Sequence, residues 1–371
     1  MEAWVVIPTL DARALLARAL ASLRSQTVRP HVVVVDNGST DGTVQLVRQR
    51  FPEVRLLALG ENLGFGRAIN RAVLDIPAAD GDALVLVNND VVCEPRFVET
   101  LCEPLEREGV GMAAGVLLQA ADPERVDSAG IELDTTLRSY DYLWNRPLSD
   151  LERAGGPVGP CGGAAAYRVE AFRRAGGFDE AFFAYWEDVD LALRLRLAGW
   201  RCALAADARA VHHHGQTLGS SSPAQRRLDA FGRGYVLARY RVCRGRPLTR
   251  AAVAVIDWPA LTAHLVVRRE VGPLRERLRG GAAGRRRPGL RPPFELATVP
   301  LRTALARQWA FLGLRLAGRA PRHFYEHEGA ARPGGRPAAS ASAPGEDVEL
   351  VDEQLGGEPS RQPRGEPRDG S

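Results

Sequence analysis

Short apolar runs alternate with helically spaced apolar residues through the first part of the chain. The runs are rich in β-branched residues and lack polar alternation, as expected of parallel strands that are buried on both faces. The apolar residues between them recur at the spacing of helices that pack against a sheet. The predicted strands cover residues 3–7, 32–35, 54–59 and 83–87, and the predicted helices cover residues 15–23, 43–51 and 65–74. This order predicts an α/β fold with right-handed crossovers.

The pattern is less regular in the second half of the chain. Residues 109–150 mix short strand-like runs with loops, and residues 159–166 are rich in glycine and alanine, so that another group can approach their backbone closely. A helix is predicted at 187–198, and short strands are predicted at 202–205 and 210–211.

Polar residues directly follow three of the predicted strands. These strand ends read Pro8-Thr9, Asp36-Asn37 and Asn88-Asn89-Asp90. The carboxyl ends of parallel strands share one edge of a sheet, and ligands of α/β proteins bind beyond that edge. We therefore expect the three strand ends to line one site.

The composition limits the class of protein. The chain has 371 residues, of which 45% are hydrophobic and 25% charged, which argues against a wholly disordered chain and against a protein with many membrane spans. No two of its five cysteines have CxxC spacing, so neither a disulfide framework nor a zinc site is indicated, and a cytoplasmic setting is expected. No signal peptide is evident. The most apolar long segment, 251–267, contains Asp257 and Pro259, so we interpret it as a buried or interfacial segment.

Charge is distributed unevenly. Residues 1–232 carry 24 arginines against 31 acidic residues, residues 233–322 carry 20 against 4, and residues 323–371 carry 5 against 10. The basic region predicts contact with an anionic membrane surface, or else a solvated face or a contact with a protein partner. It lacks the interleaved aromatic residues of nucleic-acid-binding surfaces, so no nucleic acid is expected. We divide the chain into an α/β domain at 1–225, a basic helical extension at 226–325 and a disordered tail at 326–371.

Two glycine-containing loops have residues that suit a nucleotide. Asp36 opens the loop 36–42 at a strand end, where a carboxylate can accept hydrogen bonds from a base or a ribose. In the loop at 62–70, glycines would let the backbone approach a ligand, and Arg67 could face a nucleotide. For both loops the alternative is an ordinary turn into a helix. No GxGxxG motif follows the first strand, which disfavours a nicotinamide oxidoreductase.

Two further groups of residues suit a metal ion. Asp90, beside two asparagines, fits a hard divalent cation that keeps water and substrate phosphates as its other ligands, whereas the alternative is an Asx turn. In the run of three histidines, His212 and His214 would share one face of a strand. Either could be a metal ligand, and the alternative is a run of structural histidines.

A third group suits proton transfer. Glu187, Asp188 and Asp190 stand at the start of a predicted helix. The helix dipole favours acidic residues there for purely structural reasons, but one of these neighbouring carboxylates could also be held as a general base.

Taken in order, these motifs resemble the family-2 inverting glycosyltransferases of GT-A fold, and in particular their bacterial rhamnosyltransferase-like branch. The resemblance covers about residues 3–220. The motifs that carry it are Pro8-Thr9, Asp36-Asn37-Gly38-Ser39, Asp41-Gly42, Asn62-Leu63-Gly64-Phe65-Gly66 with Asn70, Leu86-Val87-Asn88-Asn89-Asp90-Val91, Gly162-Gly163-Ala164, Gly176-Gly177-Phe178-Asp179-Glu180, Phe182-Phe183, Glu187-Asp188-Val189-Asp190-Leu191, Gly199-Trp200 and Val211-His212. It implies a mixed, mostly parallel sheet flanked by helices, followed by the basic helical extension.

The resemblance also implies roles for individual residues. Donor-nucleotide binding would fall to Thr9, Asp36, Asn62, Arg67, Asn88 and Asn89. Asp90 and His212 would hold Mg²⁺ or Mn²⁺, and Asp188 would be the general base. Support of the acceptor, or contact with it, would fall to Tyr185, Trp186, Glu187 and Asp190. One departure is that Asn88 stands where the family usually has the first acid of its DxD motif.

The sequence therefore predicts a metal-dependent inverting hexosyltransferase. Its partners would be a dTDP- or UDP-linked sugar, with rhamnose as a candidate, and a cell-envelope or lipid-linked glycan. It would work in the cytoplasm or on the inner face of the plasma membrane. The alternatives are the same fold with a UDP-hexose or UDP-GlcNAc donor, and a catalytically silent protein that binds nucleotide sugars. The donor, the acceptor and the oligomeric state cannot be read from the sequence.

Overall fold

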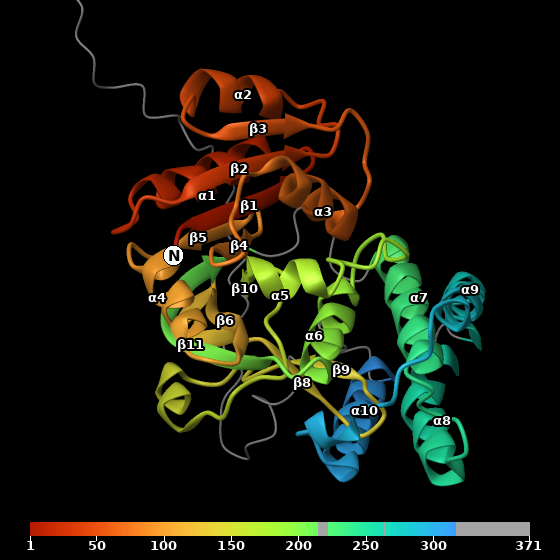
Figure 1. Ribbon diagram of the computed structural model, residues 1–371. Coiled ribbons are helices and arrows are strands. Elements are labelled where there is room, and N and C mark those ends of the chain that lie inside the picture. The colour runs from red at the N-terminus through yellow and green to blue at the C-terminus, as the bar shows by residue number, and fades with distance from the viewer. Residues whose placement is uncertain (214–221, 263–264, 267, 317–371) are drawn as a thin grey trace, which may run out of the picture. The chain divides into compact units, whose positions relative to one another are not determined.

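A computed structural model describes residues 1–213, 222–262, 265–266 and 268–316 of the chain (Figure 1). His214 and the predicted tail lie outside these residues. Within them, a nine-stranded sheet runs in the order β3-β2-β1-β4-β10-β6-β11-β5, and β7 pairs with β6. Its strands are β1 (Ala3–Thr9), β2 (His31–Asp36), β3 (Arg55–Ala58), β4 (Ala83–Val87), β5 (Val91–Cys93), β6 (Val110–Gln119), β7 (Asp122–Ser128), β10 (Ala164–Arg168) and β11 (Arg201–His212). A separate pair consists of β8 (Ile131–Leu133) and β9 (Ser139–Asp141).

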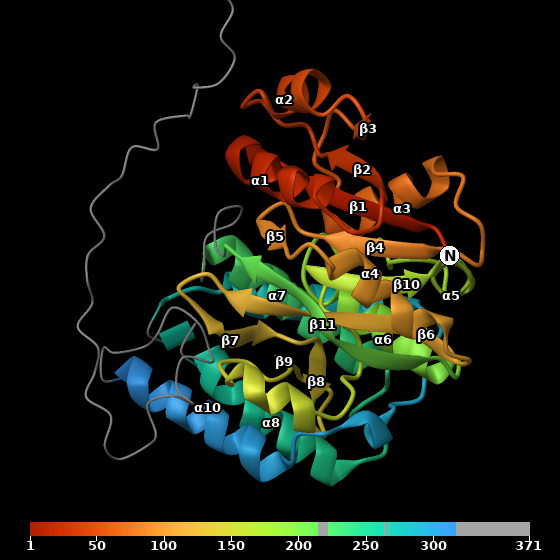
Figure 2. The same ribbon diagram turned by 90° about the vertical axis from the view of Figure 1, so that its left-hand side faces the viewer.

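The first half of the sheet agrees with the sequence-based prediction. Strands β3, β2, β1 and β4 are parallel neighbours. Beyond β4 the sheet becomes mixed, because β10 lies antiparallel between β4 and β6 (Figure 2). The α/β fold with a mixed sheet is thus confirmed.

Helices cover both faces of the sheet. They are α1 (Arg13–Arg24), α2 (Thr43–Arg50) and α4 (Phe97–Cys102) on one face, and α3 (Phe65–Asp75), α5 (Val169–Arg174) and α6 (Glu187–Leu197) on the other. Alternate residues of β1 point to the two sides, since Val5 and Ile7 join one core and Trp4 and Val6 join the other. This two-sided burial explains why the strand is apolar at every position.

The second half contains one strand that was not predicted and one prediction that was wrong in detail. The glycine- and alanine-rich stretch at 159–166 ends inside the buried strand β10, which the sequence did not predict. The segments predicted as two short strands at 202–205 and 210–211 belong to one strand, β11. The register between β11 and β6 shifts between Leu204 and Arg209. This irregularity interrupts the apolar pattern of the sequence, although the strand itself continues.

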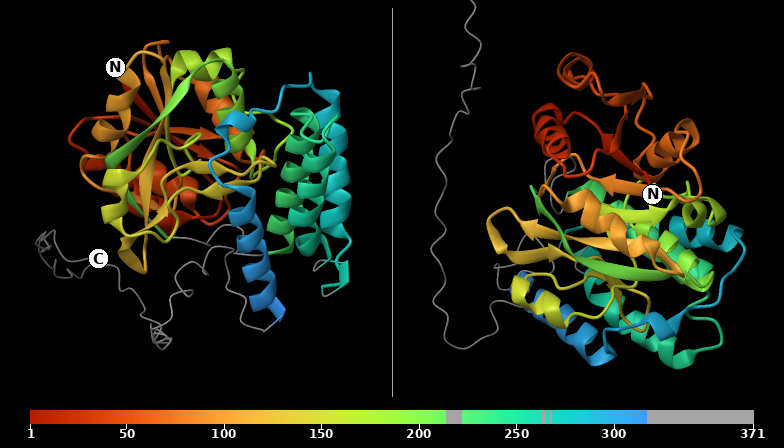
Figure 3. Two further views of the ribbon diagram at one scale, coloured as in Figure 1. Left: turned by 90° about the horizontal axis from the view of Figure 1, so that it is seen from below. Right: turned by 60° about the vertical axis from the view of Figure 1, so that its left-hand side comes forward.

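The C-terminal helices are α7 (Pro223–Arg239), α8 (Pro247–Thr262), α9 (Gly272–Arg286) and α10 (Leu301–Leu316). Helix α7 packs along α9, and α8 contacts α10 (Figure 3). Tyr235, Val236 and Tyr240 share a core with Val189 and Leu193 of α6. By their contacts, the described residues up to Leu316 belong to one compact unit. In the described part of the chain, none of the helices has both the length and the apolar character that a membrane span requires.

Candidate active site

The ends of β1, β2 and β4 meet as the sequence predicts. Thr9 pairs with Asp36 in the register of β1 and β2, and Asn89 Nδ2 donates a hydrogen bond to Thr9 Oγ1 at 3.0 Å. Asp36 is 2% exposed, and its Oδ2 accepts hydrogen bonds from the backbone N–H groups of Gly38 and Ser39, both at 3.1 Å. Its Oδ1 is buried and has no hydrogen-bond partner. A buried acceptor without a donor is energetically costly, and a ligand hydroxyl or N–H would satisfy it.

The loop between β3 and α3 is shaped by two asparagines. Asn37 is buried and its Oδ1 accepts a hydrogen bond from Leu63 N at 3.1 Å, so it fixes the loop to the end of β2. Asn62 is exposed, and its Oδ1 accepts a hydrogen bond from Gly64 N at 3.0 Å in an Asx turn. Asn37 was not among the predicted site residues, although it directly follows Asp36.

Arg67 contacts a different loop from the strand ends. Its Nε donates a hydrogen bond to the backbone oxygen of Glu180 at 3.2 Å and lies 3.7 Å from that residue's Oε2. The side chain is 48% exposed. Its contact with a nucleotide stays a prediction.

Asp90 and His212 lie together at the end of the sheet. His212 pairs with Val91 where β11 meets β5, and its Nε2 is 3.3 Å from Asp90 Oδ1. Asp90 is 9% exposed, and its Oδ1 is a buried oxygen that receives no hydrogen bond. The backbone N–H of His213 donates to the backbone oxygen of Asp90 at 2.9 Å, which holds the two segments together.

Asp127 of β7 is a site residue that the sequence did not reveal. Its Oδ2 is 2.8 Å from His212 Nδ1, and the residue is 5% exposed. Burial alone would lower the pKa of His212, but the carboxylates of Asp127 and Asp90 outweigh it and raise that pKa to about 9. Asp127 lies in the region that was interpreted as irregular, and a single acid there gives no signal in the sequence.

These residues offer two protein ligands to a divalent cation. Among the described residues, no group of three or more histidines, cysteines and acids has the arrangement of a metal site. Asp90 Oδ1 and His212 Nε2 nevertheless face each other at 3.3 Å, so both could reach one bound cation. Mg²⁺ and Mn²⁺ readily take water and phosphate oxygens as their remaining ligands, so the residues fit such an ion.

The predicted base lies at the start of α6. Asp188 is partly exposed; its Oδ2 accepts a hydrogen bond from Gly162 N at 3.2 Å, and its Oδ1 accepts one from Val189 N at 2.8 Å. Tyr185 and Trp186 directly before the helix both have left-handed backbone, with φ of 67° and 73°. Such strained pairs are maintained where the surrounding structure needs them, often at functional sites.

Glu187 is buried beside Asp188. It is 6% exposed, and its Oε2 has no hydrogen-bond partner. Burial, with the charge of Asp188 as a second cause, raises the pKa of Glu187 to about 8. Burial also raises the pKa of Asp188. The pair therefore tends to keep one proton at neutral pH, as neighbouring buried carboxyl groups do.

The Gly162-Gly163 segment brings the two parts of the site together. Gly162 donates to Asp188, and a Cβ added to Gly163 would lie 3.2 Å from Asn88 Nδ2. Burial raises the pKa of Tyr185 to about 12, and the charges of Glu187, Asp229 and Asp90 add to this. The start of α6 thus lies close to the end of β4, and the expected close approach to the glycine-rich backbone is confirmed.

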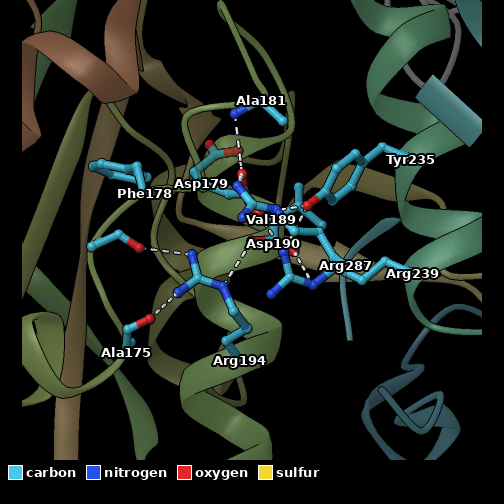
Figure 4. A network of polar contacts seen from close by, with 12 residues as sticks. Ala175, Phe178, Asp179, Ala181, Val189, Asp190, Arg194, Tyr235, Arg239 and Arg287 are labelled. Carbon is cyan, nitrogen blue, oxygen red and sulfur yellow. Dashed lines mark hydrogen bonds and ion pairs between the residues drawn. The ribbon is translucent and has the colours of Figure 1, made fainter. Parts of the chain in front are cut away.

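Trp186 and Asp190, which flank Glu187 and Asp188 in the sequence, have buried side chains. The Trp186 ring is 6% exposed; it donates through Nε1 to Asp229 Oδ1 at 2.8 Å and packs against Gly232 of α7. Asp190 is fully buried, and its carboxylate accepts a hydrogen bond from Arg194 at 2.7 Å (Figure 4). It also accepts one from Tyr240 at 3.0 Å. These contacts anchor α6 to α7. A direct contact of either side chain with an acceptor stays a prediction.

A cavity of about 340 Å³ lies beside the Asp190 network. Its walls include Arg194, Arg239 and Arg287. Each of these arginines already has a carboxylate partner, because Asp179 pairs with Arg239 and Arg287 and Asp190 pairs with Arg194. The cavity is therefore a less suitable donor site than the strand ends, where the buried Asp36 Oδ1 has no hydrogen-bond partner.

The mixed sheet with helices on both faces is a GT-A-like fold, and comparison with known proteins identifies the family. Residues 4–176 match the family model described as Glycosyl transferase family 2. The chain is 37% identical over 226 residues to the N-acetylglucosaminyl-diphospho-decaprenol L-rhamnosyltransferase of Mycobacterium tuberculosis, which covers 55% of this chain and 73% of that protein. It is also 37% identical over 206 residues to rhamnosyltransferase WbbL of Escherichia coli, covering 50% and 75%. The protein belongs to glycosyl transferase family 2, in its rhamnosyltransferase-like branch.

A solved structure supports the fold. The crystal structure of GalNAc-T7 with UDP, GalNAc and Mn²⁺ superimposes with a TM-score of 0.54 at 12% sequence identity, over 70% of this chain and 51% of that chain. At this identity the similarity establishes the fold alone.

Proposed function

We propose that this protein transfers a sugar, with rhamnose as the first candidate, from a dTDP- or UDP-linked donor to a hydroxyl of a lipid-linked glycan. The family membership supports transfer of a sugar, and the names of the two rhamnosyltransferases support the donor sugar. The name of the mycobacterial relative, which includes a diphospho-decaprenol, supports a lipid-linked acceptor. The reaction would take place at the cytoplasmic face of the membrane that holds this lipid.

One observation carries the proposal: Asn88 and Asp188 border the same two-glycine segment, next to strand ends with unpartnered buried oxygens. A nucleoside diphosphate at the strand ends would satisfy Asp36 Oδ1. Its sugar would then lie between Asn88 and Asp188, beside the backbone of Gly162 and Gly163.

Asp188 would act on the acceptor side. The two backbone hydrogen bonds fix its carboxylate, and each oxygen keeps a further lone pair for an acceptor hydroxyl. Taking the proton as that hydroxyl attacks the anomeric carbon, opposite the leaving diphosphate, gives a single displacement with inversion. The raised pKa of Asp188 makes it a stronger base than an exposed aspartate.

Asp90 and His212 would hold Mg²⁺ or Mn²⁺ on the donor side. When bound, this cation neutralises the charge that builds on the departing diphosphate. Asp127 would orient His212 from behind, as carboxylates commonly do for metal-binding histidines. EDTA should stop turnover and either ion should restore it, whereas undiminished turnover in EDTA would remove the metal from the proposal.

The substitution Asp188→Asn tests the assignment of the base. It keeps the shape of the side chain and removes its basicity, so we expect turnover to fall by about 10²- to 10⁴-fold or more. Donor binding should persist, which a thermal-shift screen of nucleotide sugars with Mn²⁺ would measure, because bound donor raises the melting temperature. The same screen identifies the nucleotide. Asp75→Asn, at the far end of α3, is the control. Wild-type turnover by Asp188→Asn would refute the proposed base.

A further inference from the structure

Helix α8 buries an aspartate and exposes several large apolar side chains. Its inner face carries Asp257, which is 3% exposed. The Asp257 carboxylate forms ion pairs with Arg233 at 3.2 Å, with Arg138 at 3.3 Å and with Arg277. These arginines come from three other segments, so Asp257 anchors α8 to the rest of the molecule.

The outer face of α8 is a stripe of apolar side chains. Leu248 is 86% exposed, Val255 is 46% exposed and Trp258 is 68% exposed, and Ala251 between them is also exposed. The spacing of three, four and three residues places all of them on one side of a helix. A surface helix in water normally turns such a stripe toward the core. Here the stripe is open, and large exposed apolar patches mark interaction sites.

Further exposed apolar residues lie near this stripe in sequence. Eight of the twelve large hydrophobic side chains that are exposed in the described part of the chain lie between Leu248 and Trp309. They include Val266 and Val271, which follow α8 and are 70% and 64% exposed. Exposed apolar area is thus concentrated in the basic region and is sparse over the catalytic part.

Arginines flank the stripe without local acids to neutralise them. Arg250 lies in the first turns of α8, and Arg268 and Arg269 follow it; all three are exposed. The acids of residues 241–270 are Asp257 and Glu270. Asp257 is already ion-paired with three arginines, and Glu270 is ion-paired with Arg226 of α7. The surface therefore presents positive charge beside a tryptophan and aliphatic side chains.

We infer that the outer face of α8 is a docking surface for an anionic lipid bilayer. A helix that lies in a membrane interface buries an apolar stripe with tryptophan among the acyl chains and directs its arginines to lipid phosphates. A second copy of this chain fits less well, because it would bring the same positive charges face to face. The inference rests on the proposed lipid-linked acceptor for its biological meaning, since docking would hold the enzyme where that acceptor lies.

Vesicle flotation with the full chain tests the surface. The wild type should float with vesicles of equal parts phosphatidylcholine and phosphatidylglycerol and not with pure phosphatidylcholine, and salt should weaken the binding. Trp258→Ala and Val255→Asp should each weaken binding by about tenfold or more, since both act at the buried stripe. Leu74→Ala is the matched control, because Leu74 is 81% exposed on α3, away from the basic region.

Three outcomes would overturn the inference. They are wild-type protein that stays unbound, stripe variants that float like the wild type, and a dimer that Trp258→Ala dissociates while vesicle binding is absent. Donor binding, measured by thermal shift without lipid, should be equal in all variants. Failure of vesicle binding with normal donor binding would reject the docking surface alone, and failure of the wild type to bind any nucleotide sugar would reject the proposed function.

Discussion

Asp127 gives the site a buried carboxylate behind His212, and its removal should weaken metal binding. In Asp127→Ala the Nδ1 side of the imidazole loses its partner at 2.8 Å, so ring orientation and tautomer are no longer fixed. We expect affinity for Mn²⁺, measured by titration of the protein without donor, to fall by about 10- to 100-fold. Asp150→Ala, in the short 3₁₀-helix Leu148–Arg153, where Asp150 pairs with Arg146 and not with His212, should bind as the wild type does. Equal affinity of both variants would mean that Asp127 has a role in packing only.

Glu187 should make the stability of the protein depend on pH. Its folded-state pKa of about 8 lies above the model value of 4.5, so the folded protein holds a proton that the unfolded chain loses between these values. Protonated Glu187 therefore contributes to the free energy of unfolding. This contribution is fully present below pH 4.5 and is lost as the pH rises through about 8. In Glu187→Gln this loss disappears. Chemical unfolding should find the variant more stable than the wild type above pH 8 and similar to it below pH 4.5.

The pH dependence assigned to Glu187 has a matched control variant and one result that would contradict it. Glu152→Gln changes an exposed glutamate and should leave the pH profile of unfolding unchanged. If Glu187→Gln follows the wild-type profile, Glu187 is ionised at neutral pH and the Glu187–Asp188 pair does not share a proton.

At the residue scale, the sequence predicted those site residues that lie at strand ends. Thr9, Asp36 and Asn89 could be placed together because parallel strands expose their carboxyl ends on one edge, whatever the loops do. Asp127 could not be found in this way. Asp127 is 85 positions away from His212 in the sequence, and the pairing of β6 with both β7 and β11 brings the two residues together. The register of these strands is shifted, and the spacing of apolar residues does not predict such a shift.

The loop into α3 illustrates how one element positions another. Gly64 has φ of +84°, and a Cβ added there would lie 2.2 Å from the backbone oxygen of Phe183. That oxygen accepts a hydrogen bond from Phe65 N at 2.8 Å, so α3 begins in contact with the segment that leads to Asp188. Only glycine permits both the backbone conformation and this approach.

Gly64→Ala should therefore destabilise the protein more than Gly60→Ala does. Both positions have positive φ, at +84° and +77°, and both variants incur backbone strain of about 1 kcal/mol. No atom lies within 4 Å of a Cβ at Gly60, whereas Gly64→Ala must displace the Phe183 backbone. We expect the difference in unfolding free energy to be about 2 kcal/mol or more. Equal melting temperatures would show that the Phe183 segment adjusts freely.

At the element scale, long periodic segments were predictable and short or interrupted ones were not. Helices α1 and α3 have apolar residues at helical spacing, and the structure contains them within a few residues of the predicted limits. Strand β10 consists of small residues whose pattern suits many conformations. Its placement between β4 and β6 is set by pairing with both neighbours, which local sequence does not specify.

In the whole molecule, the C-terminal helices share a core with the catalytic part. Phe182 and Trp186 before α6, with Val189 and Leu193 in it, pack in one cluster with side chains of α7. The net charge changes from acidic to basic near residue 232, which suggested a domain boundary close by. Charged residues lie mostly at the surface, however, so their distribution does not show which parts of the chain share a core. Hydrophobic contacts decide which parts fold together. The division at residue 225 stays a prediction, and it can be tested directly.

A chain that ends at residue 225 should not fold stably by itself. It loses Tyr235, Val236 and Tyr240, which are fully buried, and Asp190 loses the hydroxyl of Tyr240. Each large apolar side chain contributes about 1.5–3 kcal/mol by burial, so losing this layer removes about 5–10 kcal/mol. That is comparable to the whole stability of a typical domain, about 5–15 kcal/mol. Calorimetry should show no cooperative transition for residues 1–225, and a normal one for residues 1–316, which keep α7 to α10. A cooperative transition of the shorter chain would establish residues 1–225 as an independent folding unit, and the aromatic layer would then serve only to dock the helices onto it.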